Sequence, residues 1–139
     1  MKRTINTFRT LLIALWPATF LLISGFVELK SSTMMGRTFN PGYNILPVPF
    51  YIFSGIVFVF SNFHEKEFYA RKSTVLAYII ATISVILICI LWIARRFADG
   101  IFINRIIPDS LIFVNISISS FVLGYTLYSA IKAVILYKK

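Results

Sequence analysis

Residues 73–94 read STVLAYIIATISVILICILWIA and decide the fold class of this chain. The stretch of 22 residues contains no charged residue, no proline and no glycine, and basic pairs flank it at Arg71-Lys72 and Arg95-Arg96. A helix of that length measures about 33 Å, which is enough to cross a hydrocarbon core of about 30 Å. We therefore predict a transmembrane helix over 73–94.

The composition of the whole chain agrees with a membrane location. Of 139 residues, 58% are hydrophobic and 14% are charged, whereas a soluble domain carries about 25% charged residues. The net charge is +9. In so apolar a chain, basic residues are typical of the flanks of membrane spans, where they meet anionic headgroups. We expect the lipid bilayer as a partner and no nucleic acid, and the single Cys89 excludes a disulfide within the chain.

Three further apolar runs predict three more spans, over 11–27, 44–63 and 111–131. Pro17 predicts a kink in the first span because proline removes a helix hydrogen bond. The basic start could also belong to a signal peptide cleaved near Ser24-Gly25, but an uncleaved span is favoured because no A-x-A-like site is present. Pro108-Asp109-Ser110 is predicted to open the last helix.

These runs predict an all-α membrane protein with a single domain over 1–139. Short loops over 28–43, 64–72 and 95–109 would join four transmembrane helices into an antiparallel bundle. Nine of the 14 Lys and Arg residues then fall on the side of both termini. Because cytoplasmic loops are richer in Lys and Arg, we expect both termini in the cytoplasm of a bacterial inner membrane.

The last span carries the most polar side chains and supplies most candidates for helix packing. One stripe comprises Asn115, Ser119, Val122, Thr126 and Ser129, and Ser120-x-x-x-Gly124 is a small-xxx-small pattern. Ser54-Gly55 marks a similar place on the second span. Small residues allow close approach of a neighbouring helix. We expect Asn115 to form an interhelix hydrogen bond within the membrane, with ligand binding as the alternative.

No pattern of catalytic or metal-binding residues is evident. His64 is the only histidine, so the paired histidines of a zinc-protease helix are missing, and the chain has only five acids. We expect no enzyme, no cofactor and no metal. The four spans contain no ionisable side chain in their cores, which disfavours an ion-coupled pump and leaves a neutral pore made by oligomers open.

Two resemblances rest on short segments. Ala70-Arg71-Lys72 before the third span and Ile107-Pro108-Asp109 before the fourth resemble small four-helix inner-membrane proteins of enterobacteria, the YbjO type. That resemblance implies an inner-membrane location and no known activity. The segment 62–72, NFHEKEFYARK, is similar to the charged and aromatic loop of immunity proteins against pore-forming colicins, which are small basic membrane bundles without catalytic residues.

Three functions are therefore compatible with the sequence. The first is a non-enzymatic multi-pass protein that acts through helix–helix contact with a membrane partner or with a second copy of itself. The second is an immunity protein against a pore-forming bacteriocin. The third is a small channel or transport subunit.

Overall fold

The computed structural model describes residues 2–38, 47–62, 66–97 and 106–138. These residues form α-helices and one 3-10 helix, and the described part of the chain contains no strand. The elements are α1 (Lys2–Thr38), α2 (Pro47–Asn62), α3 (Lys66–Tyr69), α4 (Lys72–Phe97), the 3-10 helix η2 (Asp109–Phe113) and α6 (Ile116–Lys138). The all-helical fold class is thus confirmed.

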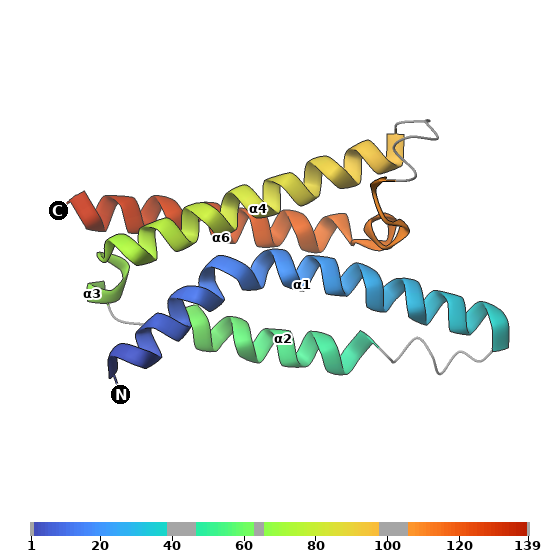
Figure 1. Cartoon of the computed structure of the whole chain (residues 1–139), viewed down its shortest axis with the longest axis horizontal. Helices are drawn as coiled ribbons and strands as arrows, with labels where there is room; N and C mark the ends of the chain where they lie inside the picture. Colours follow the sequence, from blue (N-terminus) through green and yellow to red (C-terminus); the bar gives the residue numbers. More distant parts are fainter. Residues whose placement is uncertain (1, 39–46, 63–65, 98–105, 139) are drawn as a thin grey trace.

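Helix α1 is much longer than the span predicted over 11–27. It contains 37 residues, or about 55 Å, so the prediction of a loop over 28–43 is wrong for residues 28–38. No proline interrupts this segment, and the hydroxyls of Thr33 and Thr38 donate to the carbonyls of Leu29 and Met34 within the helix. Residues 39–43 lie outside the described residues. Pro17 is inside α1, and the helix bends in its N-terminal half (Figure 1).

The long helices alternate in direction, and α1 and α4 are the helices through which the others are joined. It packs against α2, α4 and η2, and α4 packs in turn against α6. The start of α1 and the end of α6 lie at the same end of the bundle, together with α3, which contacts α4 and α6 (Figure 1). The opposite end contains η2 and the end of α4.

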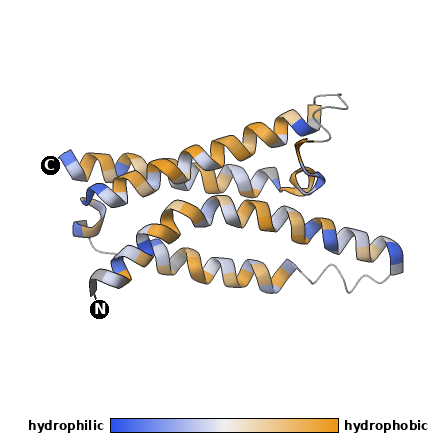
Figure 2. Ribbon diagram, in the orientation of Figure 1, coloured by the Kyte–Doolittle hydropathy of each residue, from blue (hydrophilic) through white to orange (hydrophobic). Residues whose placement is uncertain are grey.

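Two features of burial set this bundle apart from a soluble protein, although its core clusters are hydrophobic. Buried side chains include many small hydroxyls, namely Ser24, Ser31, Ser54, Ser61, Thr74, Thr82, Ser119, Thr126 and Ser129. Large apolar side chains of α4 are exposed instead, among them Leu76, Ile80, Ile83, Leu87 and Ile90. In Figure 2 hydrophobic residues cover the middle of α4, and hydrophilic ones gather at its ends. Small polar residues inside and aliphatic residues outside are typical of helices that pack in lipid.

Three of the helices are long and apolar enough to cross a membrane, over Thr4–Thr38, Lys72–Arg95 and Ser117–Lys138. Helix α2 has 16 residues, or about 24 Å, which is shorter than the span predicted over 44–63. Residues 44–46 and 63 of that predicted span are outside the described residues. Helix α4 extends slightly beyond the predicted 73–94.

The last helix begins later than predicted. Pro108 precedes a single 3-10 segment, η2, the backbone is extended at Val114, and α6 starts only at Ile116. The predicted helix start at 108–110 is therefore wrong. The interruption allows Leu111 and Val114 to be buried in a core cluster with Leu21 of α1. A guanidinium–carboxylate ion pair between Arg95 and Asp109 also joins α4 to η2.

Gly25 explains how η2 reaches α1. A Cβ atom at this position would collide with the backbone carbonyl of Ser110 and would lie 2.8 Å from Cγ2 of Val114. Only glycine leaves room for the two backbones at this distance. Close packing by a small residue therefore occurs on α1, at a position the sequence predictions did not include among the packing candidates.

Candidate functional site: the groove between α2 and α6

An open apolar groove of about 210 Å³ runs between α2 and α6, with α1 as its floor. Trp16, Pro17 and Phe20 of α1 line the floor. The walls are formed by Tyr51, Ser54, Gly55 and Phe58 of α2 and by Ile118, Phe121 and Val122 of α6. Of these side chains, Phe121 is the most prominent, since it is 73% exposed. The groove is therefore an apolar surface that the described part of the chain leaves uncovered.

Ring contacts between α1 and α2 fix the floor to one wall. The rings of Phe20 and Phe50 stack with centroids 5.8 Å apart, and Trp16 contacts Phe53 edge to face at 6.2 Å. The Tyr51 phenol donates a hydrogen bond of 3.0 Å to Oε1 of Glu28 on α1. Aromatic pairs of this geometry add about 1 kcal/mol each beyond their buried area. The α1–α2 pair is thus held at several points along its length.

At one end the groove closes, because α2 there contacts both α6 and α4. The rings of Phe58 and Tyr125 lie 4.5 Å apart. The Tyr78 phenol of α4 donates a 2.8 Å hydrogen bond to Oδ1 of Asn62, whose Nδ2 donates to the carbonyl of Phe58 and to Oγ of Ser61. Asn62 is thereby satisfied inside the bundle and joins two helices.

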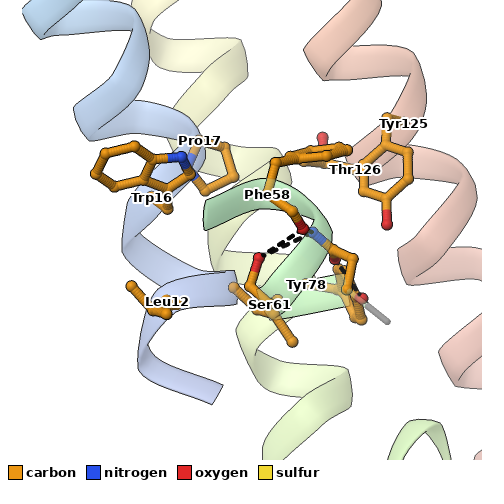
Figure 3. Close-up of a pocket in the computed structure, with 10 residues that line it drawn as sticks. Leu12, Trp16, Pro17, Phe58, Ser61, Tyr78, Tyr125 and Thr126 are labelled. Atoms are coloured by element: carbon orange, nitrogen blue, oxygen red, sulfur yellow. Dashed lines mark hydrogen bonds between the residues drawn. The ribbon is translucent and has the colours of Figure 1, made fainter. Parts of the chain in front are cut away.

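A small cavity adjoins this closed end. Its volume is about 10 Å³, and Figure 3 shows Trp16 and Pro17 of α1, Phe58 and Ser61 of α2 and Tyr125 of α6 around it. A cavity of this size is just large enough for one water molecule, which also needs polar partners. The wall of this cavity is mainly apolar. We therefore interpret the cavity as a gap in the packing beside the groove and not as a binding site.

Two of the candidate packing residues, Ser54 and Ser119, are buried. Ser54 and Ser119 are 4% and 1% exposed, and each hydroxyl donates to a carbonyl four residues earlier in its own helix. Val122, Thr126 and Ser129 of the α6 stripe are buried as well. Hydroxyls that bond within their own helix need no partner elsewhere, so neighbouring helices can approach them closely.

The remaining small residues face outwards. Gly55, Ser120 and Gly124 are exposed, and a Cβ atom at either glycine would meet no atom within 4 Å in the described chain outside its own helix. Gly124 follows Phe121 by three residues, so both lie on the same side of α6. We call Gly55 with the exposed strip Ser120, Phe121 and Gly124 the open face. Gly55 and Phe121 line the groove, and Ser120 and Gly124 continue the exposed strip along α6 outside it.

Asn115 does not have the role that the sequence suggested. It precedes α6, it is exposed, and its Oδ1 accepts hydrogen bonds from the backbone N–H groups of Ser117 at 2.9 Å and Ile118 at 3.3 Å. This is an N-cap, which satisfies donors in the first helical turn. The predicted interhelix bond of Asn115 is therefore wrong, because the later helix start moves this residue out of the span.

Asn62, rather than Asn115, is the asparagine that takes part in an interhelix hydrogen bond. Asn62 ends α2, and the apolar run over 44–63 already included it. A sequence signal could have found this bond. Asn62 is a strongly polar residue at the end of one apolar run, and Tyr78 lies near the start of the next run. Tyr69 lies beside this bond, because its ring stacks on the ring of Tyr78 with centroids 5.9 Å apart.

The segment that resembles the immunity-protein loop is largely structural where it is described. Phe68 and Tyr69 are buried in a core cluster with Ile13 and Tyr78. Glu67 and Arg71 are exposed. Residues 63–65, which include His64, lie outside the described residues. In the residues that are described, no three His, Cys, Asp or Glu side chains are close enough to hold a metal ion.

Comparison of the chain with protein-family models, with curated proteins and with solved structures returns no match. The function therefore has to be argued from the geometry of the open face and of the groove beside it.

Proposed function

We propose that this protein is a non-enzymatic multi-pass membrane protein that works by binding a transmembrane helix of another chain along its open face. The observation that carries the proposal is the exposure of Gly55 and Gly124 on two helices that border one apolar groove. In lipid, association is driven by close packing rather than by burial of apolar area, so uncovered glycines are the places where a second backbone can approach.

The rest of the bundle supports this choice by contrast. On the buried stripe of α6, Ser119 and Thr126 are already packed within the chain and cannot take another helix. The exposed side of α4 carries large aliphatic residues such as Ile83 and Leu87, which suit lipid contact. Within the described residues, the open face is the one surface that combines exposed small residues with a projecting aromatic side chain, Phe121, beside a groove. That combination is suited to a helix with a complementary bulky surface.

We place the protein in a bacterial inner membrane with four spans and both termini in the cytoplasm. The alternating directions of the long helices support an even number of crossings, with α2 as the shortest of them. The N-terminal helix is expected to be retained. Ser24 and Gly25 lie in the middle of α1, and cleavage there would remove the half of α1 that contains Pro17 and Leu21.

The test uses leucine at exposed glycines. A Cβ atom at Gly55 or Gly124 meets no atom of the described chain outside its own helix, so we expect the fold to persist in Gly55→Leu and Gly124→Leu. Gly36→Leu is the matched control, because Gly36 is equally uncovered but lies near the end of α1. Association is measured in membranes by energy transfer between differently labelled copies, and by recovery of stoichiometric complexes in mild detergent.

We expect both open-face variants to lose association and the Gly36 variant to keep it. Energy transfer between copies would identify a second copy as the partner, and a complex without it would identify a different membrane protein. A monomer that associates with nothing in growing cells would contradict the proposal, as would equal association of all three leucine variants with the partner. Tight liposomes would further argue against a channel made by oligomers.

A further inference from the structure

A second feature of the molecule, separate from the open face, is a group of cations at the end of the bundle that contains both chain termini. Arg9 of α1, Arg71 between α3 and α4, and Lys132 of α6 each lie over an aromatic ring. The distances from the charged group to the ring centroid are 5.0 Å for Arg9 on Phe60, 5.8 Å for Arg71 on Phe68, and 4.6 Å for Lys132 on Tyr69.

The rings that support these charges belong to α2 and α3. Phe60 lies two residues before Asn62, and the Tyr69 phenol donates a 3.5 Å hydrogen bond to the carbonyl of Asn62. Phe68 and Tyr69 are consecutive in the sequence, and both are buried. A cation held within about 6 Å of a ring keeps its charge and loses mobility, because the ring attracts it without neutralising it. The three cations are thus positioned by rings that do not cancel their charge.

No carboxylate pairs with these cations in the part of the chain that the structure describes. The one ion pair found there, between Arg95 and Asp109, lies at the opposite end of the bundle. Lys72 and Lys138 add exposed positive charge near the termini, and Glu67 is the one described acid at this end. Arg9 also has a buried Nε atom without a hydrogen-bond partner. This end therefore has an excess of positive charge and an unsatisfied donor.

The surroundings of the cations are apolar. Phe8 and Leu11 beside Arg9 are 55% and 54% exposed, and Ile131 and Ile135 beside Lys132 are both 52% exposed. A water-soluble polyanion or an acidic protein loop would neutralise the charges and leave this apolar surface uncovered. A ligand that carries an anionic phosphate and acyl chains covers both.

We propose that Arg9, Arg71 and Lys132 form a binding site for the headgroup of an anionic phospholipid, whose acyl chains lie along the exposed apolar residues of α1 and α6. Phosphate oxygens would accept charge-assisted hydrogen bonds from the guanidinium and ammonium groups. Each Lys or Arg near an anionic membrane surface contributes about fivefold in affinity. The site is distinct from the open face and does not depend on the helix partner proposed above.

Native mass spectrometry of the purified full-length protein, titrated with phosphatidylglycerol, cardiolipin or phosphatidylcholine, tests the site directly. We expect both anionic lipids to be retained in preference to phosphatidylcholine. Arg9→Gln with Lys132→Gln should lower their retention about 25-fold, as two independent contributions multiply. Lys30→Gln with Arg37→Gln is the matched control, because it removes the same charge from the far end of α1, at the opposite end of the bundle.

Two further measurements separate loss of lipid binding from loss of stability and from simple anion binding. Arg9→Lys retains the charge and should retain most of the lipid binding, even if the glutamine variant is less stable. Inorganic phosphate added in excess distinguishes a headgroup site that needs acyl chains from a simple anion site, and we expect it to displace little lipid. Equal retention of the three lipids would overturn the proposal. Equal loss in the control pair, or complete displacement by inorganic phosphate, would do so as well.

Discussion

The phenol of Tyr78 on α4 donates a 2.8 Å hydrogen bond to the side-chain oxygen of Asn62 at the end of α2. This bond connects two helices that are otherwise joined mainly through α1, which packs against both. Replacing Tyr78 by phenylalanine keeps the ring stacked on Tyr69 and removes the donor. Interhelix hydrogen bonds in membrane proteins contribute about 1 kcal/mol, so we expect a loss of that size in the free energy of unfolding.

Unfolding in mixed micelles with increasing dodecyl sulfate, followed by tryptophan fluorescence, measures this loss. Tyr128→Phe is the matched control, because Tyr128 is 64% exposed on α6. Its variant should unfold like the unmodified protein. Equal unfolding of both variants would show that the Tyr78–Asn62 bond does not hold α4 to α2.

Gly25→Ala should destabilise the bundle. The added Cβ would collide with the backbone carbonyl of Ser110, so η2 has to move away from α1. Overpacking of this kind costs about 2 kcal/mol in the free energy of unfolding. The same unfolding assay measures the change.

Gly36→Ala provides a control of opposite sign. The position is on the same helix and open, and alanine is a better helix former than glycine by about 1 kcal/mol. We expect this variant to be as stable as the unmodified protein or more stable. If both alanine variants changed stability in the same direction, the close approach of η2 to Gly25 would be refuted.

Asn115→Ala should weaken the start of α6. The side-chain oxygen of Asn115 accepts from two backbone donors of the first turn, and loss of such a cap costs about 1 kcal/mol. Asn115→Asp preserves the acceptor and places a negative charge at a helix N-terminus, so it should be neutral or stabilising. Amide hydrogen exchange at residues 117–119 reports the change locally. Slow exchange in the alanine variant would contradict the capping role.

Reporter fusions test the number and direction of the spans. A fusion after Lys139 should report the cytoplasm, and one after Asp99 should report the outer side. If α2 did not cross the membrane, three crossings would separate the two ends of the chain. A second fusion before Lys2 therefore distinguishes the cases, because agreement between the two terminal reporters requires an even number of spans.

The helical class and the positions of the long apolar helices could be predicted from the sequence because each depends on one continuous run. The run over 73–94 corresponds closely to α4. The extension of α1 to Thr38 was missed because residues 28–38 are polar and were interpreted as a loop, although nothing in them breaks a helix. Polarity indicates the end of a span, but it does not indicate the end of a helix.

The candidate site was harder to predict from the sequence, because it depends on how each helix is rotated about its own axis. Of the stripe read from the spacing, Ser119, Val122, Thr126 and Ser129 are buried, whereas Asn115 is exposed. Whether Gly55 and Gly124 face inwards or outwards depends on how each helix is turned against its neighbours. Asn115 and Gly25 were misjudged for a related reason. Both depend on η2, a short irregular segment whose path is set by contacts with α1 that are distant in the sequence.

The central place of α1 also has a consequence for biogenesis. It precedes α2, α4 and η2 in the chain, and all three pack against it. Each later segment therefore enters the bilayer with a partner already present. For α2, whose 16 residues make it the shortest of the long helices, insertion as a hairpin with α1 would supply the contacts that it lacks alone. The order of translation and the order of assembly thus coincide in this chain.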